Sequence, residues 1–459
     1  MSSVSLLWFR RDLRLSDQAA LIAACDEGSV TPVYVLDDET PRHRAMGGAS
    51  RWWLHHSLAS LDASLREKGS RLILRRGRAD EVLGKLAEET GAGRVHAIRH
   101  YEPWWRNAER AVAKRLELHL HDGNYLAPPG SILTGGGEPY KIFTPFWRAL
   151  NDRMPPAEPR PAPRSIPAPA QWPDSDALAD WRLLPTRPNW ASGFGADWTP
   201  GEAAALERVE DFRDGASRYD DTRNLPSIEG SSRLSPHLHF GEVSPAHIWH
   251  RVADCGGSAD AFLREIGWRD YAQNVILQFP DYGARNARTN FDHFAWRNLN
   301  AADVAADLKA WQRGRTGYPI VDAGMRQLWA TGWMHNRVRM LAASFLIKHL
   351  LIDWRVGERW FWDTLVDADY GSNATNWQWV AGSGVDSNMF VRIMAPLSQS
   401  EKFDAAAYIR QWVPELAQLS DAAIHDPDAA GCRPRGYPPK LIGHREARER
   451  ALAAYRAIG

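Results

Sequence analysis

The sequence has few cysteines, and this scarcity limits its chemistry. Its 459 residues include only three, Cys25, Cys255 and Cys432, which lie far apart. Three cysteines cannot build a disulfide framework, and an iron–sulfur cluster usually takes four. Their scarcity indicates a reducing compartment, so we expect the protein in the cytoplasm.

Long hydrophobic runs and an excess of one charge are also missing. No stretch approaches the roughly 18 apolar residues that span a bilayer, and the start of the chain lacks the basic and apolar regions of a signal peptide. We therefore expect no membrane partner. The formal net charge is zero, which argues against binding to DNA by bulk charge alone. A local basic surface would still allow DNA binding.

The Gly-x-Gly-x-x-Gly fingerprint of dinucleotide-binding Rossmann folds is missing as well. The first apolar strand candidate, residues 4–9, is followed by Arg10-Arg11-Asp12-Leu13-Arg14 instead. A dinucleotide bound there in the usual way is therefore not expected.

Tryptophan, by contrast, is abundant, with 22 residues. The simplest interpretation is a bulky core, because indole is a large apolar group. Tryptophan also stacks on nucleic-acid bases, and its ring is redox-active. Its positions within motifs therefore bear on function.

Residues 1–128 alternate short β-like runs with helical patterns. The expected strands are 4–9, 32–36, 71–74, 94–98 and 116–120, and the expected helices are 17–25, 49–68, 79–90 and 108–115. Strands separated by helices of this length predict βαβ units and a parallel sheet. We expect an α/β, Rossmann-like domain here.

A linker and a helical domain are expected to follow. Residues 129–199 are predicted to be an interdomain linker, whose proline-rich middle, 154–173, favours an extended strap. From residue 200 to 459 the apolar spacing is helical. Helices are expected at 200–212, 259–279, 301–312, 321–331, 338–351 and 358–365. The fold class is therefore α/β followed by all-α.

Hydroxyl and arginine side chains cluster between Tyr219 and Pro236. The cluster contains Arg223 and the run Ser231-Ser232-Arg233-Leu234-Ser235. Ser235 before Pro236 is typical of a helix start, with the hydroxyl as N-cap. Such a start could hold a phosphate. Plain helix capping is the alternative.

Two further segments combine polar groups with tryptophan at helical spacing. Glu265 and Trp268, at i and i+3, share a helix face and could read and stack on a base; a core tryptophan beside an ion-paired glutamate is the alternative. Trp333, Asn336, Arg337 and Met340 follow at i, i+3, i+4 and i+7. This mixed face is a poor core stripe and a plausible pocket wall.

The last constellation carries carboxylates and amides. It comprises Asp367, Asp369 and Asn373, followed by Trp377 and Trp379. No histidine or cysteine accompanies the carboxylates, so a transition-metal site is not expected. Hydrogen bonding to a ribose or a ring nitrogen suits these groups better.

Long motifs along the chain resemble those of the photolyase/cryptochrome family. In the family's order, they are Trp8–Arg14, Thr316–Pro319, Gly332–Arg337, Ile352–Arg355, Trp377–Trp379 and Tyr408–Arg410. The resemblance implies light-driven repair of cyclobutane pyrimidine dimers in DNA, by electron transfer from excited, reduced FAD held in the helical domain.

The family's functional residues carry over by position. The resemblance implies that FAD is bound by Tyr219, Ser231, Ser232, Leu234, Ser235, Trp268, Asn336, Arg339, Asp367, Asp369 and Asn373. The dimer pocket would be lined by Glu265, Trp268, Met340 and Trp379, with DNA contacts from Arg223, Arg269, Arg337, Arg392 and Lys402. The electron-hopping chain would be Trp377, Trp354 and Trp296.

The resemblance also separates subfamilies. Asn373 is a neutral amide where plant cryptochromes carry Asp, and Met340 stands where (6-4) photolyases place a histidine pair. Both residues favour cyclobutane-dimer repair, as does the lack of a long tail after the helical domain. A cryptochrome photoreceptor, (6-4) repair and a dark redox flavoprotein are the alternatives. We expect a monomer without an obligate protein partner.

A second, antenna chromophore is left open by the sequence. Folate-binding members of the family carry an Asn-Glu pair where this chain has Trp104 and Trp105. A folate, a deazaflavin or no antenna are the three alternatives.

Overall fold

The chain folds into two compact units. The computed structural model describes residues 3–387 and 390–458. The first unit comprises Met1–Ser217, Ser232–Pro280 and Val366–Asp369, and the second comprises Arg218–Ser231, Asp281–Leu365 and Tyr370–Gly459. The predicted domain boundaries at residues 128 and 199 stay a prediction.

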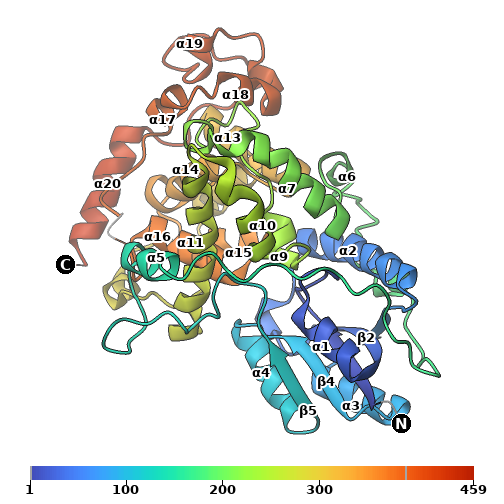
Figure 1. Ribbon diagram of the computed structural model, residues 1–459. Helices are drawn as coiled ribbons and strands as arrows, with labels where there is room; N and C mark the ends of the chain where they lie inside the picture. Colours follow the sequence, from blue (N-terminus) through green and yellow to red (C-terminus); the bar gives the residue numbers. More distant parts are fainter. Residues whose placement is uncertain (1–2, 388–389, 459) are drawn as a thin grey trace. The chain divides into compact units, whose positions relative to one another are not determined.

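A five-stranded parallel sheet is the framework of the first unit (Figure 1). The spatial order is β3-β2-β1-β4-β5, with β1 (Ser3–Phe9), β2 (Gly28–Leu36), β3 (Ile73–Arg76), β4 (Arg94–Ile98) and β5 (Glu117–His121). In register, Leu6 of β1 lies opposite Thr31 of β2 and Val95 of β4. The central strand is apolar and fully buried from Leu6 to Phe9, as expected of a parallel strand covered on both faces. The predicted α/β fold is confirmed.

Four helices connect these strands. They are α1 (Ala19–Glu27), α2 (Gly48–Glu67), α3 (Ala79–Thr90) and α4 (Pro103–Ala113). Helix α4 begins at Pro103, five residues before the predicted start at Ala108. Proline suits the first turn of a helix because its missing N–H would have no partner there. Trp104 and Trp105 are buried in that first turn and belong to the core of this unit.

The predicted linker belongs to the first unit. It includes α5 (Phe143–Asn151), a short 3₁₀ helix (Leu178–Trp181) and α6 (Phe194–Asp197). The proline-rich part has no regular structure, and its carbonyl groups accept hydrogen bonds from the sheet region. The N–H of Asp17 donates to Arg160 O at 2.7 Å, and the N–H of Val30 donates to Pro167 O at 2.8 Å. Main-chain hydrogen bonds therefore hold the proline-rich segment at more than one point along its length.

The rest of the first unit is helical. It contains α7 (Glu202–Ala216), α9 (Ser235–Phe240), α10 (Pro245–Val252) and α11 (Ala259–Gln278). Helix α11 is 20 residues long and carries several polar residues that are buried, among them Asp270, Gln273 and Asn274.

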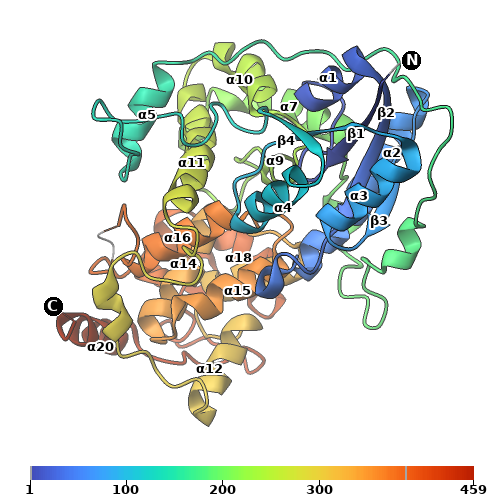
Figure 2. The same cartoon turned by 90° about the horizontal axis from the view of Figure 1, so that it is seen from below.

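All the regular secondary structure in the described residues of the second unit is helical. Its longer helices are α12 (Ala302–Gln312), α13 (Pro319–Thr331), α14 (Asn336–Ser344), α15 (Trp354–Thr364), α16 (Tyr370–Ala381) and α20 (His444–Arg456). The shorter ones are α8 (Tyr219–Thr222), α17 (Pro396–Lys402), α18 (Ala406–Trp412) and α19 (Asp421–Ile424). Helix α14 continues into one π-helical turn, Phe345–His349. Figure 2 shows α14, α15 and α16 lying close together.

Across the described ranges, 3–387 and 390–458, no helix is long and apolar enough to cross a membrane.

Candidate functional site

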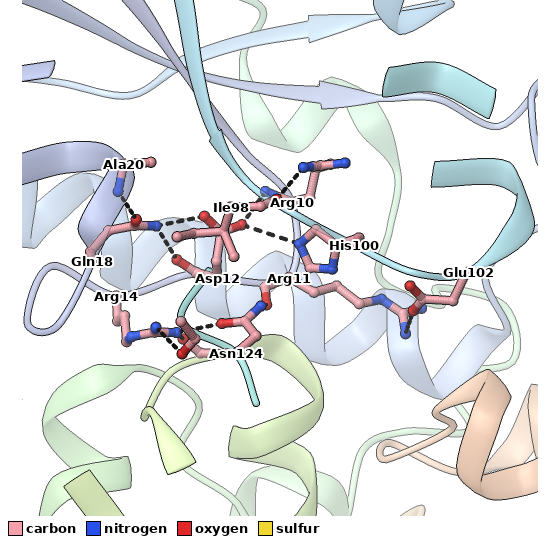
Figure 3. A network of polar contacts seen from close by, with 12 residues as sticks. Arg10, Arg11, Asp12, Arg14, Gln18, Ala20, Ile98, His100, Glu102 and Asn124 are labelled. Atoms are coloured by element: carbon pink, nitrogen blue, oxygen red, sulfur yellow. Dashed lines mark hydrogen bonds and ion pairs between the residues drawn. The ribbon is translucent and has the colours of Figure 1, made fainter. Parts of the chain in front are cut away.

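Charged side chains follow β1 and β4 at the carboxyl edge of the sheet (Figure 3). Ligands bind at this edge in open α/β sheets, where the strand order reverses. Here Arg10 pairs with Glu109 at 2.7 Å, Asp12 with His100 at 3.7 Å, and Arg14 donates to Asn124 Oδ1 at 2.8 Å.

The Asp12 carboxylate lies at the centre of this edge. Its burial opposes the charge, but His100 and Arg10 outweigh burial and hold the pKa of the carboxyl below its usual value. The segment that replaces the glycine fingerprint therefore forms an internal ion-pair network. An antenna chromophore stays a prediction.

In the first unit, two carboxylates of the segment Val366–Asp369 meet polar groups of α9 and α11. Ser235 Oγ donates to Asp367 Oδ2 at 2.6 Å, and Gln273 Nε2 donates to Asp369 Oδ2 at 3.1 Å. Asp367 is nearly buried. Residues from three segments that are far apart in sequence thus form one polar cluster, and three of them, Ser235, Asp367 and Asp369, are predicted FAD contacts.

The predicted helix start at Ser235 needs a correction. Helix α9 includes Ser235 as its first residue, Leu234 is the N-cap, and no side chain caps the helix. The hydroxyl of Ser235, now inside the first turn, donates a hydrogen bond to Asp367 Oδ2. Ser232 is the hydroxyl that binds a main-chain N–H, that of Leu234, at 3.3 Å.

Helix α11 carries Glu265 and Trp268 as predicted, one turn apart and both half-buried. One face of the Trp268 indole is covered by Phe143, with ring centroids 3.5 Å apart and an interplanar angle of 11°. A ligand that stacks on Trp268 therefore has the opposite face at most.

Arg269, predicted to contact DNA, is held inside the first unit. Its guanidinium donates to the carbonyls of Asn124 and Leu238, and it lies 4.4 Å from the ring of Tyr125. These contacts give Arg269 a structural role, because its donors are directed at the protein's own main chain.

In the second unit, the loop after Tyr219 meets the start of α14. Asn224 Oδ1 accepts hydrogen bonds from Arg337 Nε at 3.2 Å and Arg337 Nη2 at 2.5 Å. The Arg337 guanidinium also lies 4.6 Å from the ring of Phe403. Burial, and then the positive charge of Arg223, lower the pKa of Arg337. Two predicted DNA contacts, Arg223 and Arg337, thus influence one another electrostatically.

The predicted helix face from Trp333 to Met340 is wrong in one respect. Helix α13 ends at Thr331, Gly332 takes a left-handed conformation, and α14 begins only at Asn336. Trp333 therefore lies in the turn between two helices. The cap of α14 is His335, whose side chain accepts from the Arg337 N–H.

Besides Arg337, three predicted site residues lie on α14. Asn336 is exposed, while Arg339 and Met340 are half-buried. The Nε–H group of Arg339 donates to the carbonyl of Met334 at 2.7 Å. Arg337 and Met340 lie one turn apart and touch, with 3.8 Å between Nη1 and Sδ.

Asn373 lies on α16 and its amide is held by a buried glutamate. Asn373 Nδ2 donates to the main-chain oxygen and to Oε1 of Glu358, both at 3.0 Å. Glu358 is fully buried on α15. With both amide hydrogens bound to Glu358, the oxygen of Asn373 is left as an acceptor. A sequence alone could not reveal this pairing, since Glu358 lies on a different helix.

Trp377, the predicted first member of the electron chain, is buried among aromatic rings of the second unit. Its ring centroid lies 5.0 Å from Phe361 and 6.4 Å from Trp311. Trp354 is fully buried, and its indole N–H donates to Asn286 Oδ1 at 2.9 Å. The ring centroids of Trp296 and Phe294 lie 4.3 Å apart. The predicted order Trp377, Trp354, Trp296 stays a prediction.

The remaining predicted DNA contacts lie at the surface of the second unit. Arg392 and Lys402 are exposed, and Trp379 on α16 is half-buried. Lys402 is the last residue of α17, and its ammonium lies 5.4 Å from the ring of Phe403. Tyr219, a predicted FAD contact, is nearly buried beneath the guanidinium of Arg223 at 5.1 Å.

The polar groups of these clusters suit a large polar cofactor such as FAD. Hydroxyls, amides and carboxylates are the groups that bind phosphate, ribose and ring nitrogens. Among the described residues, Gln273 Oε1 in the first unit and Thr375 Oγ1 in the second are two of the buried polar atoms that have no hydrogen-bond partner. Buried polar atoms are normally hydrogen-bonded, so each of these two could bond a ligand or a water.

The comparisons with known proteins agree with this chemistry. Residues 5–165 match the family model for DNA photolyase, and residues 262–457 match the FAD binding domain of DNA photolyase. A deoxyribodipyrimidine photo-lyase of Agrobacterium fabrum is 48% identical over 99% of this chain and 98% of that protein. Cryptochrome-2 of Arabidopsis thaliana is 37% identical over 93% of this chain and 73% of that protein.

Solved structures give the same result. A bacterial class III photolyase from Agrobacterium tumefaciens superimposes with a TM-score of 0.94 at 46% identity, covering 100% of this chain and 98% of that one. A similarity of this extent covers both compact units. The chain belongs to the DNA photolyase family. The predicted family and the predicted cofactor, FAD, are confirmed.

Proposed function

We propose that this chain repairs cyclobutane pyrimidine dimers in DNA, driven by light. The observation that carries the proposal is the 48% identity, over 99% of the chain, to a protein named deoxyribodipyrimidine photo-lyase. Bound FAD, when reduced and excited by light, would supply the electron that splits the dimer. The protein's own part is to bind the cofactor, to place the dimer and to exclude competing reactions.

The residues that would hold FAD are proposed for each unit by itself. In the first unit they are Ser232, Leu234, Ser235, Trp268, Asp367 and Asp369. In the second unit they are Tyr219, Ser231, Asn336, Arg339 and Asn373. Carboxylates that already accept from Ser235 and Gln273 are oriented to accept further bonds from ligand hydroxyls.

Glu265 and Trp268 would recognise the dimer. A carboxylate can accept a hydrogen bond from a base edge, and it could steady the damaged base through that bond. Because Phe143 covers one face of Trp268, the indole would offer its other face or its edge to the base. Flipping a damaged pair out of the DNA stack costs only a few kcal/mol. The contacts in the pocket therefore have only this small free-energy cost to offset.

The polarity of Asn373 favours repair over signalling. Its amide hydrogens are held by Glu358, so this side chain offers an acceptor oxygen and no acidic proton. An aspartic acid at this position could donate a proton to a reduced ring nitrogen, whereas this amide could not. A cryptochrome-type photoreceptor is the alternative, supported by the identity to Cryptochrome-2.

We further propose action in the cytoplasm and as a monomer. Cys25, Cys255 and Cys432 are all free thiols, as expected in a reducing compartment.

A repair assay separates the candidate functions. The purified, FAD-loaded and reduced chain is mixed with an oligonucleotide that contains one cyclobutane dimer, and dimers are counted in blue light and in the dark. Light-dependent loss of dimers supports the proposal. Bound FAD without loss would support a photoreceptor. Repair of a second oligonucleotide that contains one (6-4) product, without loss of the cyclobutane dimer, would support (6-4) repair. Turnover of a soluble donor in the dark would support a redox carrier.

A further inference from the structure

A lysine with no assigned role is buried in the π-helical turn of the second unit. Lys348 is fully buried within Phe345–His349. Its Nζ donates a hydrogen bond to the main-chain oxygen of Arg392 at 3.0 Å and lies 5.6 Å from the ring of Phe390. Single π-helical turns are rare and often mark functional positions.

The burial of this ammonium works against the charge. Burial, and then the nearby Arg392, lower the pKa of Lys348 to about 7. A buried charge is unfavourable unless hydrogen bonds compensate it, and methionine would fill a similar volume without that penalty. The lysine is therefore better explained by what it binds than by the space it fills.

The segment that Lys348 binds is anchored on both sides of Val391. Phe390 is buried against Tyr455, with ring centroids 4.9 Å apart and nearly parallel, and against Phe294 at 5.1 Å. Two residues after Phe390, the carbonyl of Arg392 accepts the hydrogen bond from Lys348. The main chain is thus fixed from beneath, while the side chains of Val391 and Arg392 are exposed.

An arginine whose main chain is fixed in this way suits a phosphate contact. Phosphate contacts set the position of a protein on DNA, and a fixed donor loses less entropy when it binds. With its carbonyl turned towards Lys348, Arg392 exposes its positive side chain. A loop without this hydrogen bond would not keep the Arg392 carbonyl and the Arg392 guanidinium apart in this way.

We propose that Lys348 is a positioning residue for DNA binding: its ammonium fixes the main chain of Arg392 so that the Arg392 guanidinium meets a backbone phosphate beside the dimer. The inference rests on the proposed function, because it takes damaged DNA as the ligand. Lys348 itself touches neither DNA nor cofactor.

The test measures the affinity of the FAD-loaded, full-length chain for a dimer-containing oligonucleotide across a salt series. Each lost phosphate contact lowers the slope of log affinity against log salt by about 0.9. We expect Arg392→Ala and Lys348→Met each to lower the slope by about this amount and to weaken binding about tenfold. The double variant is expected to bind no more weakly than Arg392→Ala alone.

Two further variants distinguish positioning from charge. Lys309→Met removes one exposed positive charge from α12 and should leave the slope unchanged. Lys348→Gln keeps an N–H donor for the carbonyl without a charge and should retain most of the slope. FAD absorbance and circular dichroism of every variant establish that it is folded. If Lys348→Met does not bind FAD, Lys348→Leu, which also lacks an N–H donor, takes its place in the comparison.

Several results would overturn the inference. An unchanged slope in Lys348→Met, or a slope in Lys348→Gln as low as in Arg392→Ala, would do so. So would a double variant whose loss of affinity is the product of the two single losses. An Arg392→Ala variant that binds DNA like the wild type would also do so. Failure of the wild-type chain to prefer dimer-containing over undamaged DNA would instead refute the proposed function.

Discussion

Gly357 on α15 is a position where one added methyl group should disturb Trp377, the first residue of the proposed electron chain. A Cβ built there would lie 2.6 Å from Leu346 Cδ2 and 2.5 Å from Trp377 Cζ3, and closer still to Trp377 Cη2. Trp377 cannot move away freely, because Phe361 and Trp311 hold its ring on other sides. We therefore expect Gly357→Ala to force the indole from its position.

The size of the effect follows from two opposing terms. Overpacking a rigid core costs about 3 kcal/mol at the upper end of its usual range. Alanine in place of glycine inside a helix returns about 1 kcal/mol. The net loss of about 2 kcal/mol corresponds to a fall in Tm of about 4–8 °C for a unit of this size.

A matched control and a double variant make this prediction specific. Gly84 also lies inside a helix, α3, and a Cβ there would meet nothing within 4 Å, so Gly84→Ala should raise stability. In a Trp377→Phe background the two overlapping ring atoms are gone and Leu346 Cδ2 alone still overlaps, so Gly357→Ala should cost clearly less than in the wild type. Thermal unfolding of all variants checks this. An equal loss from Gly357→Ala with either aromatic residue would refute the reasoning.

Three other predictions address charge, redox chemistry and polar satisfaction. Burial raises the pKa of Asp270 to about 7 from an unfolded value near 3.8, so the folded state holds a proton between these values and stability falls as pH rises through that window. Asp270→Asn should therefore gain stability relative to the wild type as the pH rises from 5.5 to 8.5 in denaturant unfolding; a constant difference would contradict the assignment. Trp377→Phe should slow photoreduction of oxidised FAD and leave repair by pre-reduced protein mostly intact, whereas equal loss of both would argue against separate roles. Glu358→Leu should cost about 1–3 kcal/mol in urea unfolding, because it leaves an amide hydrogen of Asn373 unpaired, and Glu358→Gln should cost less; identical losses would count against the pairing.

The sheet of the first unit could be predicted well from sequence because its signals are local. Each strand is a short apolar run between helical segments, and β4 (Arg94–Ile98) and α3 (Ala79–Thr90) have the bounds that their patterns predict. Helix α4 was predicted to start late, since its first turn consists of proline and two tryptophans, which have weak helix propensity.

The helical part was predicted less completely. The sequence did not predict helix α16, because polar and apolar residues are mixed around its whole circumference and leave no apolar stripe. Asn373 and Gln378 are buried on this helix together with Trp377. The continuous face from Trp333 to Met340 was wrong because Gly332 and His335 end one helix and start the next. Spacing alone does not reveal a turn that preserves the helical period.

The polar pairs of the site could not be predicted at all. Asn224 with Arg337, and Glu358 with Asn373, join residues of different helices or loops. Neither partner carries a sequence signal of its own, because an isolated amide or carboxylate occurs on most helices. Only tertiary structure brings these residues together, and both pairs fix side chains whose positions matter for the proposed reaction.

The most direct test of the central claim is an action spectrum for dimer loss. The reduced, FAD-loaded chain is bound to dimer-containing DNA, and repaired dimers per incident photon are measured at a series of wavelengths and in the dark. We predict no repair in the dark and a yield that follows the absorption of the bound, reduced flavin, with any antenna band added to it. Repair in the dark, or bound flavin and bound DNA without repair at any absorbed wavelength, would contradict the account.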